Sequence, residues 1–192
     1  MSASELAFAE VLKQLGARIQ EFSTEHDLEL TCDFVSAPAA DVDRCEREIG
    51  VKFPTQLRQL YTSFSDGGRE PDSWNGFFGG DEFNSLSNVV AAHHDHATTP
   101  EYETDDQGWW SDTLQVKQGM LWRNQWIVIG SGYDLRYFYL DTDPAPEGTY
   151  GQVLIAEHTS CRYGVVAKNL AEFIDLCLKV PSNSNFPILK PH

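Results

Sequence analysis

The residues best suited to chemistry lie in one polar segment, where three histidines are followed by four acids: His93, His94, His96, Glu101, Glu103, Asp105 and Asp106. Imidazole and carboxylate groups together could hold a divalent ion for metal-dependent hydrolysis. On a helix, however, His93 and His96 share a face while His94 points elsewhere, and no acid lies four residues before His93 to complete a two-histidine motif. We therefore expect a solvated helix end, and we predict no metal and no cofactor.

Other signatures of catalysis are missing from the sequence. Residues 130–132 read Gly-Ser-Gly after an expected strand, as a phosphate-binding loop can, but a second strand follows where a helix is needed. We interpret them as a hairpin turn. No serine or cysteine stands in a nucleophile elbow or a triad signature, and adjacent acids such as Asp81 and Glu82 are common on acidic surfaces. The sequence predicts a protein that is not an enzyme, and a metal-dependent hydrolase is the least supported alternative.

Acidic residues outnumber basic ones, because 29 Asp and Glu stand against 14 Lys and Arg and give a net charge of -15. Such a field repels the phosphates of nucleic acids and anionic lipid surfaces. It attracts basic protein surfaces and speeds encounter with them. We therefore expect a protein partner, no nucleic acid and no membrane, although the charge could also serve solubility alone.

The acidity is concentrated in residues 70–116, which contain ten acids and no Lys or Arg. Within this stretch, residues 101–110 interleave carboxylates with aromatic side chains. Carboxylates that attract a basic partner and aromatics that anchor it are typical of an interface with a cationic protein. The alternative is a surface loop whose tryptophans fold back into the core. We predict partner-binding residues at Glu101, Tyr102, Glu103, Asp105, Asp106, Trp109 and Trp110, with Asp81 and Glu82 as lesser candidates.

The elements that must position these residues can be predicted from hydrophobic periodicity. Apolar residues at steps of three and four predict helices over 5–22, 39–49, from Pro54 to the turn at 66–68, and over 169–180. A further short helix, capped by Ser87 and ended by Pro100, is expected between them. Runs rich in β-formers predict strands over 122–129, 135–140, 153–156 and 163–166. Their connections are too short for crossover helices, which favours an antiparallel meander.

These elements predict an α+β fold with a single domain, in which N-terminal helices pack on a mostly antiparallel sheet and a C-terminal helix closes the chain. We divide it into an N-terminal helix and linker (1–38), a core (39–180) and a flexible tail (181–192). The N-terminus lacks a signal-peptide pattern, so we expect a cytoplasmic protein. The scattered cysteines at 32, 45, 161 and 177 indicate reduced, mostly buried thiols, without a zinc or disulfide framework.

Several blocks of the sequence also match a known pattern. The most specific block covers the end of one helix, a turn and the start of a second helix. Its matching residues are Glu46, Ile49, Gly50, Val51, Phe53, Pro54, Leu57, Leu60 and Tyr61. Further matches run through Phe78, Gly79 and Gly80, then through 127–141, 151–158 and 167–174. By these motifs the sequence resembles the SUKH superfamily over about residues 39 to 178. It departs from the pattern at Asp66, where asparagine is usual, and at Ala156, where a large aromatic is frequent.

The SUKH superfamily includes the domain of a fungal cell-wall assembly regulator and many bacterial toxin-immunity proteins. The resemblance implies a mixed sheet flanked by helices, no catalytic motif, and loops that set partner specificity. It implies an immunity protein that neutralises a cognate toxin domain, often a nuclease in such settings, by direct binding. The alternative is an intracellular regulatory or scaffold protein of the fungal type. The sequence leaves the oligomeric state open.

Overall fold

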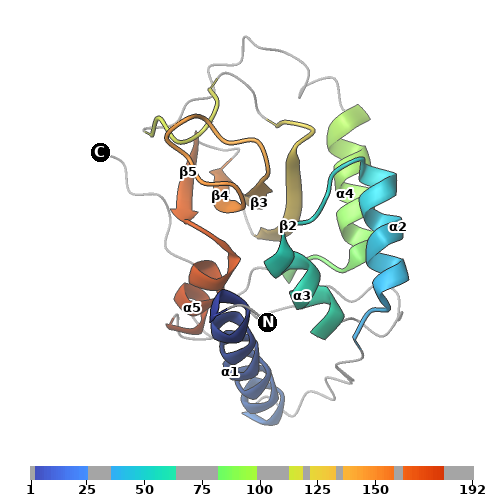
Figure 1. Ribbon diagram of the computed structural model, residues 1–192, viewed down its shortest axis with the longest axis vertical. Coiled ribbons are helices and arrows are strands. Elements are labelled where there is room, and N and C mark those ends of the chain that lie inside the picture. The colour runs from blue at the N-terminus through green and yellow to red at the C-terminus, as the bar shows by residue number, and fades with distance from the viewer. Residues whose placement is uncertain are drawn as a thin grey trace.

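The computed structural model describes residues 3–25, 36–63, 82–98, 113–118, 122–132, 136–157 and 162–179. These residues form the predicted α+β fold, with helices before the sheet and one helix after it (Figure 1). The helices are α1 (Ala3–Glu25), α2 (Ala39–Ile49), α3 (Thr55–Ser63), α4 (Leu86–Thr98) and α5 (Leu170–Lys179). The strands are β1 (Glu82–Phe83), β2 (Trp126–Gly132), β3 (Arg136–Asp141), β4 (Gln152–Glu157) and β5 (Arg162–Ala167).

The strands pair in sequence order, β1-β2-β3-β4-β5, and every ladder in this described part is antiparallel. The predicted meander is therefore confirmed. The mixed sheet that the family resemblance implied is wrong for these strands, because connections as short as those between β2, β3, β4 and β5 cannot bring two strands into parallel pairing.

The hairpin turn expected at residues 130–132 is also wrong, because β2 runs through all three of them. Ser131 pairs with Glu82 of β1 on one side and with Tyr137 of β3 on the other. The register shifts between Val128 and Gly130, which marks a β-bulge. Glycine suits such an irregularity inside a strand, so the Gly-Ser-Gly sequence signals a bulge here and the chain turns later.

The helix boundaries follow the sequence signals, with one correction. Helix α2 ends at Gly50, which takes a left-handed backbone conformation with φ of 72°. Helix α4 is capped by Ser85, whose Oγ accepts a hydrogen bond from the Asn88 N–H at 3.1 Å. The predicted cap, Ser87, lies inside the helix instead. The end of the helix predicted from Pro54 to the turn at 66–68, including Phe64, lies outside the described residues.

Both faces of the sheet are covered by side chains. The larger core lies between one face and the helices, and it includes side chains such as Ile127, Phe138 and Ile155 together with residues of all five helices. A second cluster covers the opposite face: Val116, Trp122, Trp126, Val128, Tyr139, Leu154, Ala156 and Tyr163. Because alternate residues of a strand point to opposite faces, β2, β3 and β4 are apolar on both sides.

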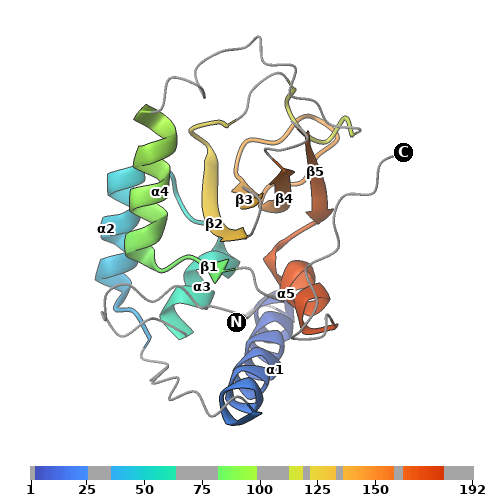
Figure 2. The same cartoon turned by 180° about the vertical axis from the view of Figure 1, so that it is seen from behind.

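Figure 2 shows how the helices are distributed around the sheet. Helices α2 and α4 pack against each other beside β2, and α1 packs against α5 at the opposite side of the molecule. Helix α4 reaches both cores, because Val89 belongs to the larger core while Ala92 packs against the second cluster. Cys45 and Cys177 are buried as expected, whereas Cys32 and Cys161 lie outside the described residues.

Candidate functional site

Most of the predicted partner-binding residues lie outside the described residues: Asp81, Glu101, Tyr102, Glu103, Asp105, Asp106, Trp109 and Trp110. Glu82 is placed by its backbone in β1, opposite Ser131. The structure does describe the two segments that flank residues 99–112 of the acidic stretch, namely the last turn of α4 and residues 113–118. Figures 1 and 2 place both at the same end of the molecule.

Two buried histidines fix the last turn of α4 by packing and hydrogen bonds. His96 is only 2% exposed, and its Nδ1–H donates to the Ala92 carbonyl at 2.7 Å while its Nε2 accepts from the Tyr139 hydroxyl at 3.1 Å. His93 is also buried, and its Nε2–H donates to the Asn124 carbonyl at 3.1 Å. The solvated helix end expected for this segment is therefore wrong for His93 and His96. It holds for His94, which is exposed.

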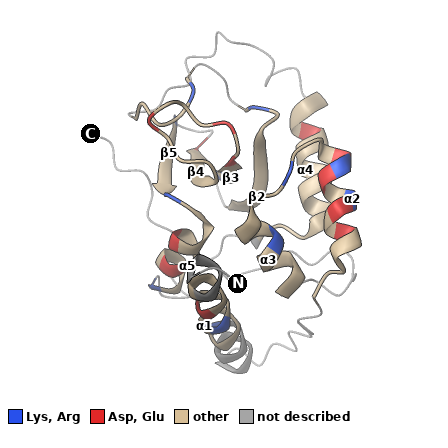
Figure 3. Ribbon diagram, in the orientation of Figure 1, with Lys and Arg blue, Asp and Glu red and all other residues tan. Residues whose placement is uncertain are grey.

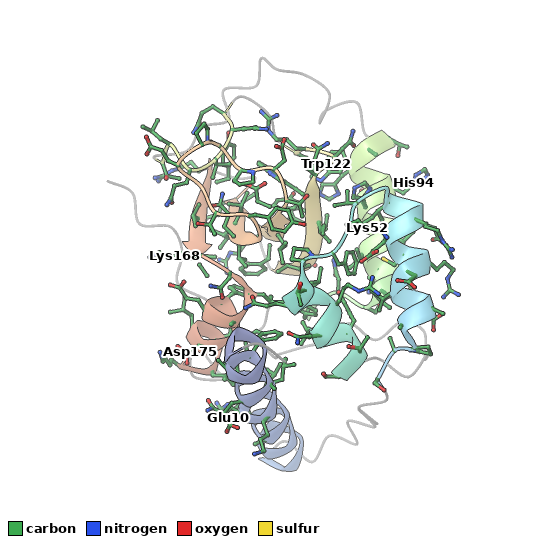
Figure 4. All side chains as sticks on the ribbon, in the orientation of Figure 1. Glu10, Lys52, His94, Trp122, Lys168 and Asp175 are labelled. Carbon is green, nitrogen blue, oxygen red and sulfur yellow. The ribbon has the colours of Figure 1, made fainter. Side chains whose placement is uncertain are left out.

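The two buried histidines lie in an aromatic setting. The ring of His93 meets that of Trp122 edge-on with centroids 5.0 Å apart, and His96 meets Tyr137 in the same way at 5.0 Å. Figure 4 shows Trp122 beside α4, with His94 also labelled. Burial lowers the pKa of both His93 and His96, so both rings are neutral at neutral pH. No group of three His, Cys, Asp or Glu in the described part is placed to hold a metal ion.

Residues 113–118 are fixed to the loop between β3 and β4. The Gln115 carbonyl accepts hydrogen bonds from the Ala145 N–H at 3.2 Å and from the Gln152 side-chain amide at 2.9 Å. The Lys117 ammonium forms an ion pair with Asp143. We call residues 113–118 and 141–152 together the platform.

A buried polar network within the platform holds the β3–β4 loop in place. The Asp141 carboxylate is fully buried, and it accepts from the Asp143 N–H at 2.9 Å and from Gln152 Nε2 at 3.0 Å. Gln152 Oε1 in turn accepts from the Thr149 N–H at 3.0 Å. Burial raises the pKa of Asp141, although these hydrogen bonds oppose the shift. Such a network ties the loop to the sheet in one arrangement.

The platform also carries features that the sequence prediction missed. Leu114 and Tyr150 are exposed at 68% and 55%, the large hydrophobic side chains that are exposed in the described part of the chain. The predicted strands over 135–140 and 153–156 leave residues 143–150 in the connection between them, to which the sequence assigned no binding role. A weak signal existed, because a turn rich in proline and glycine between two strands is where binding residues are commonly presented.

The model of the SMI1 / KNR4 family (SUKH-1) matches residues 36–176. The chain belongs to the SMI1 / KNR4 family (SUKH-1). No curated protein matches the chain. The last turn of α4, the platform and the whole sheet all fall inside the SUKH-1 match, whereas α1 lies outside it.

The most specific SUKH-1 block is organised by Glu46 of α2. Its side chain is 1% exposed and accepts hydrogen bonds from Lys52 Nζ at 2.7 Å, from the Phe53 N–H at 3.1 Å and from Arg58 at 2.5 Å. Burial opposes ionisation, but these donors outweigh it and lower the pKa of Glu46. The carboxylate thus joins α2, the connecting segment and α3, which gives the block a structural role.

The described residues of this SUKH-1 chain contain few groups with unused chemistry. Burial raises the pKa of the Cys45 thiol to about 12, so it stays protonated and unreactive at neutral pH. The buried histidines, Glu46 and Asp141 all have hydrogen-bond partners within the fold. No described helix is both long and apolar enough to cross a membrane.

Proposed function

We propose that this chain is a non-catalytic immunity protein that neutralises a cognate, basic toxin domain by binding it directly. The observation that carries the proposal is membership of the SUKH-1 family over residues 36–176. The resemblance to immunity proteins supplies the class of function. The net charge of -15 supplies the chemistry of the partner, because complementary potentials favour a basic protein over nucleic acids or anionic lipids.

The interface proposed for this function is the acidic stretch between α4 and the platform. Residues 70–116 contain ten acids and neither Lys nor Arg, and Trp109 and Trp110 are available as aromatic anchors. The described segments on either side of residues 99–112 are both packed, by His96 before them and by Gln115 after them. A segment held at both ends can be presented to a partner with less ordering on binding.

Charge reversal tests this interface. We expect the fourfold variant with Lys at Glu101, Glu103, Asp105 and Asp106 to lose protection of cells that express the toxin encoded beside the gene of this chain. Affinity for the purified toxin domain should fall at least about a hundredfold, because like charges would then face each other. The measurements are survival on toxin induction and isothermal titration calorimetry.

A matched control reverses the same number of acids elsewhere, at Glu10, Asp41, Glu172 and Asp175. Figure 3 shows α1 and α5, which carry Glu10, Glu172 and Asp175, towards the lower end of the view, and Figure 1 places residues 113–118 towards the upper end. Asp41 lies in the first turn of α2. Asp175 pairs with Lys179 only at the surface, where ion pairs contribute little stability. Thermal unfolding should show that both variants fold. Full protection by the first variant with unchanged affinity would sink the acidic interface, and a chain with no toxin gene beside its own would weaken the immunity role.

A further inference from the structure

Two exposed hydrophobic side chains stand on the platform. Leu114 is 68% exposed and Tyr150 is 55% exposed, while the other large hydrophobic side chains of the described residues are buried or half-buried. A single exposed leucine would need no explanation. Here, however, the two residues come from segments distant in sequence that hydrogen bonds of Gln115 hold together.

The joining of these segments is specific. The Gln115 carbonyl accepts from both Ala145 and Gln152, and Lys117 pairs with Asp143. The approach is also close, because a Cβ added at Gly148 would lie 2.3 Å from the Gln115 carbonyl oxygen. Figures 1 and 2 both show residues 113–118 beside the β3–β4 loop.

The platform is therefore arranged before any partner arrives. Asp141 and Gln152 are 0% and 1% exposed, so the network that holds the loop is itself protected from water. Side chains on a preorganised surface lose little conformational freedom on binding, which raises the affinity that a given contact yields. Tyrosine is among the residues that most often dominate binding energy at the centre of an interface.

The charge around the platform selects the kind of occupant. Residues 101–112, directly before the platform, carry five acids and neither Lys nor Arg, and the β3–β4 loop adds an exposed Glu147, while Asp143 is paired with Lys117. Two copies of a chain with a net charge of -15 would repel each other across such a surface. A basic protein would be attracted.

We propose that Leu114 and Tyr150 are the apolar anchors of the partner interface, and that they insert into apolar pockets ringed by basic residues on the toxin domain. This inference rests on the proposed immunity function and deepens it. The acidic stretch supplies attraction over distance, and the platform supplies the contacts that hold the complex together.

The experiment uses the full chain and the purified toxin domain encoded beside its gene. Surface plasmon resonance compares wild type with Leu114→Ser, Tyr150→Ser and the double variant. We expect each single change to weaken affinity about tenfold or more, and the double change about a hundredfold, mainly through faster dissociation. Tyr150→Phe keeps the ring and should retain most of the affinity.

Gln14→Ser on α1, which is exposed and far from the platform in the sequence, provides the matched control and should bind as wild type does. Circular dichroism should show unchanged unfolding for all variants, because the substituted side chains are exposed. Equal binding by wild type and the double serine variant would overturn this inference alone. No binding by wild type would overturn the proposed function together with the inference. A wild-type dimer that the double variant abolishes would show that the surface joins two copies, which also overturns the inference.

Discussion

The carboxylate of Glu46 is nearly inaccessible to water, yet three donors converge on it from Lys52, Phe53 and Arg58. Each donor comes from a different part of the segment after α2, so the residue determines how α2 and α3 meet. A buried carboxylate of this kind is stabilising only while its partners remain, because an unpaired donor in the interior costs more than a hydrogen bond contributes. Replacing Glu46 should therefore destabilise the packing of the helices, starting with that of α2 against α3.

We predict that Glu46→Gln lowers the free energy of unfolding by about 1–3 kcal/mol at neutral pH, because the amide offers one acceptor where three donors converge. Urea denaturation measures the change. Glu48→Gln, on the exposed side of the same helix, is the control and should change stability by less than about 0.5 kcal/mol. Equal losses in the two variants would contradict the role assigned to Glu46.

Acidic pH should remove the contribution of Glu46 to the free energy of unfolding. Its pKa is lowered in the folded protein, so the stability that the ionised carboxylate contributes is fully present above its ordinary value of 4.5 and is lost as the pH falls through the folded value. The difference in unfolding free energy between wild type and Glu46→Gln should therefore shrink on acidification below pH 4.5.

The buried histidines His93 and His96 should also make the free energy of unfolding depend on pH, in a higher pH range than Glu46 does. Burial lowers both pKa values, so the neutral rings contribute stability that is fully present above 6.5 and is lost as the pH falls through the folded values. We predict that wild type loses stability between neutral pH and pH 5.5, and that His96→Gln loses less over this interval. His94→Gln should change the slope less than His96→Gln does, since His94 is exposed and acts on His93 only through its charge. Identical slopes in all three proteins would contradict this assignment.

At the scale of elements, α4 and the platform are the two packed segments that flank residues 99–112 of the acidic stretch. Helix α4 is capped by Ser85 at its start and packed by His93 and His96 at its end. The platform depends on the close approach of Gly148 to Gln115. Glycine is needed at residue 148 because any side chain would collide with the opposite backbone.

We predict that Gly148→Ala destabilises the protein by about 1–3 kcal/mol, because the added methyl group must push apart two joined segments. Amide hydrogen exchange at Ala145 should accelerate, since its bond to Gln115 would be strained. Gly50→Ala is the comparison, because Gly50 has a positive φ of 72° but no atom within 4 Å of the added carbon. It should cost about 1–2 kcal/mol without affecting exchange at Ala145. Unchanged exchange in Gly148→Ala would contradict the close packing of the platform.

At the scale of the whole molecule, the net charge of -15 governs encounter more than stability. We predict that the association rate with the basic toxin domain falls about tenfold or more as sodium chloride rises from about 0.05 to 0.5 M, because salt screens long-range attraction. The dissociation rate should change far less, since it depends on close contacts. Stopped-flow measurements separate the two rates. An association rate independent of salt would argue against electrostatic steering.

The sequence by itself determined the order and type of the five helices and of strands β2 to β5, but the two-residue strand β1 was not predicted. The apolar spacing of α2 predicted a helix over 39–49, which the structure confirms, because a repeat of three and four residues can bury one face only as a helix. Short connections likewise left the antiparallel meander as the available topology. The class of the protein followed from motifs such as Glu46 and the turn at Gly50, and the family match bears this out.

The tertiary structure alone decided which polar and apolar residues are hidden. His93 and His96 looked like residues of a solvated helix end, but they are buried because Trp122 and Tyr139, distant in sequence, build a second cluster on the other face of the sheet. Leu114 and Tyr150 would pass for core residues in any sequence pattern. They are exposed in the fold, on two segments that the hydrogen bond from Gln152 to Gln115 joins. Burial depends on which segments meet, and local periodicity carries no information about that.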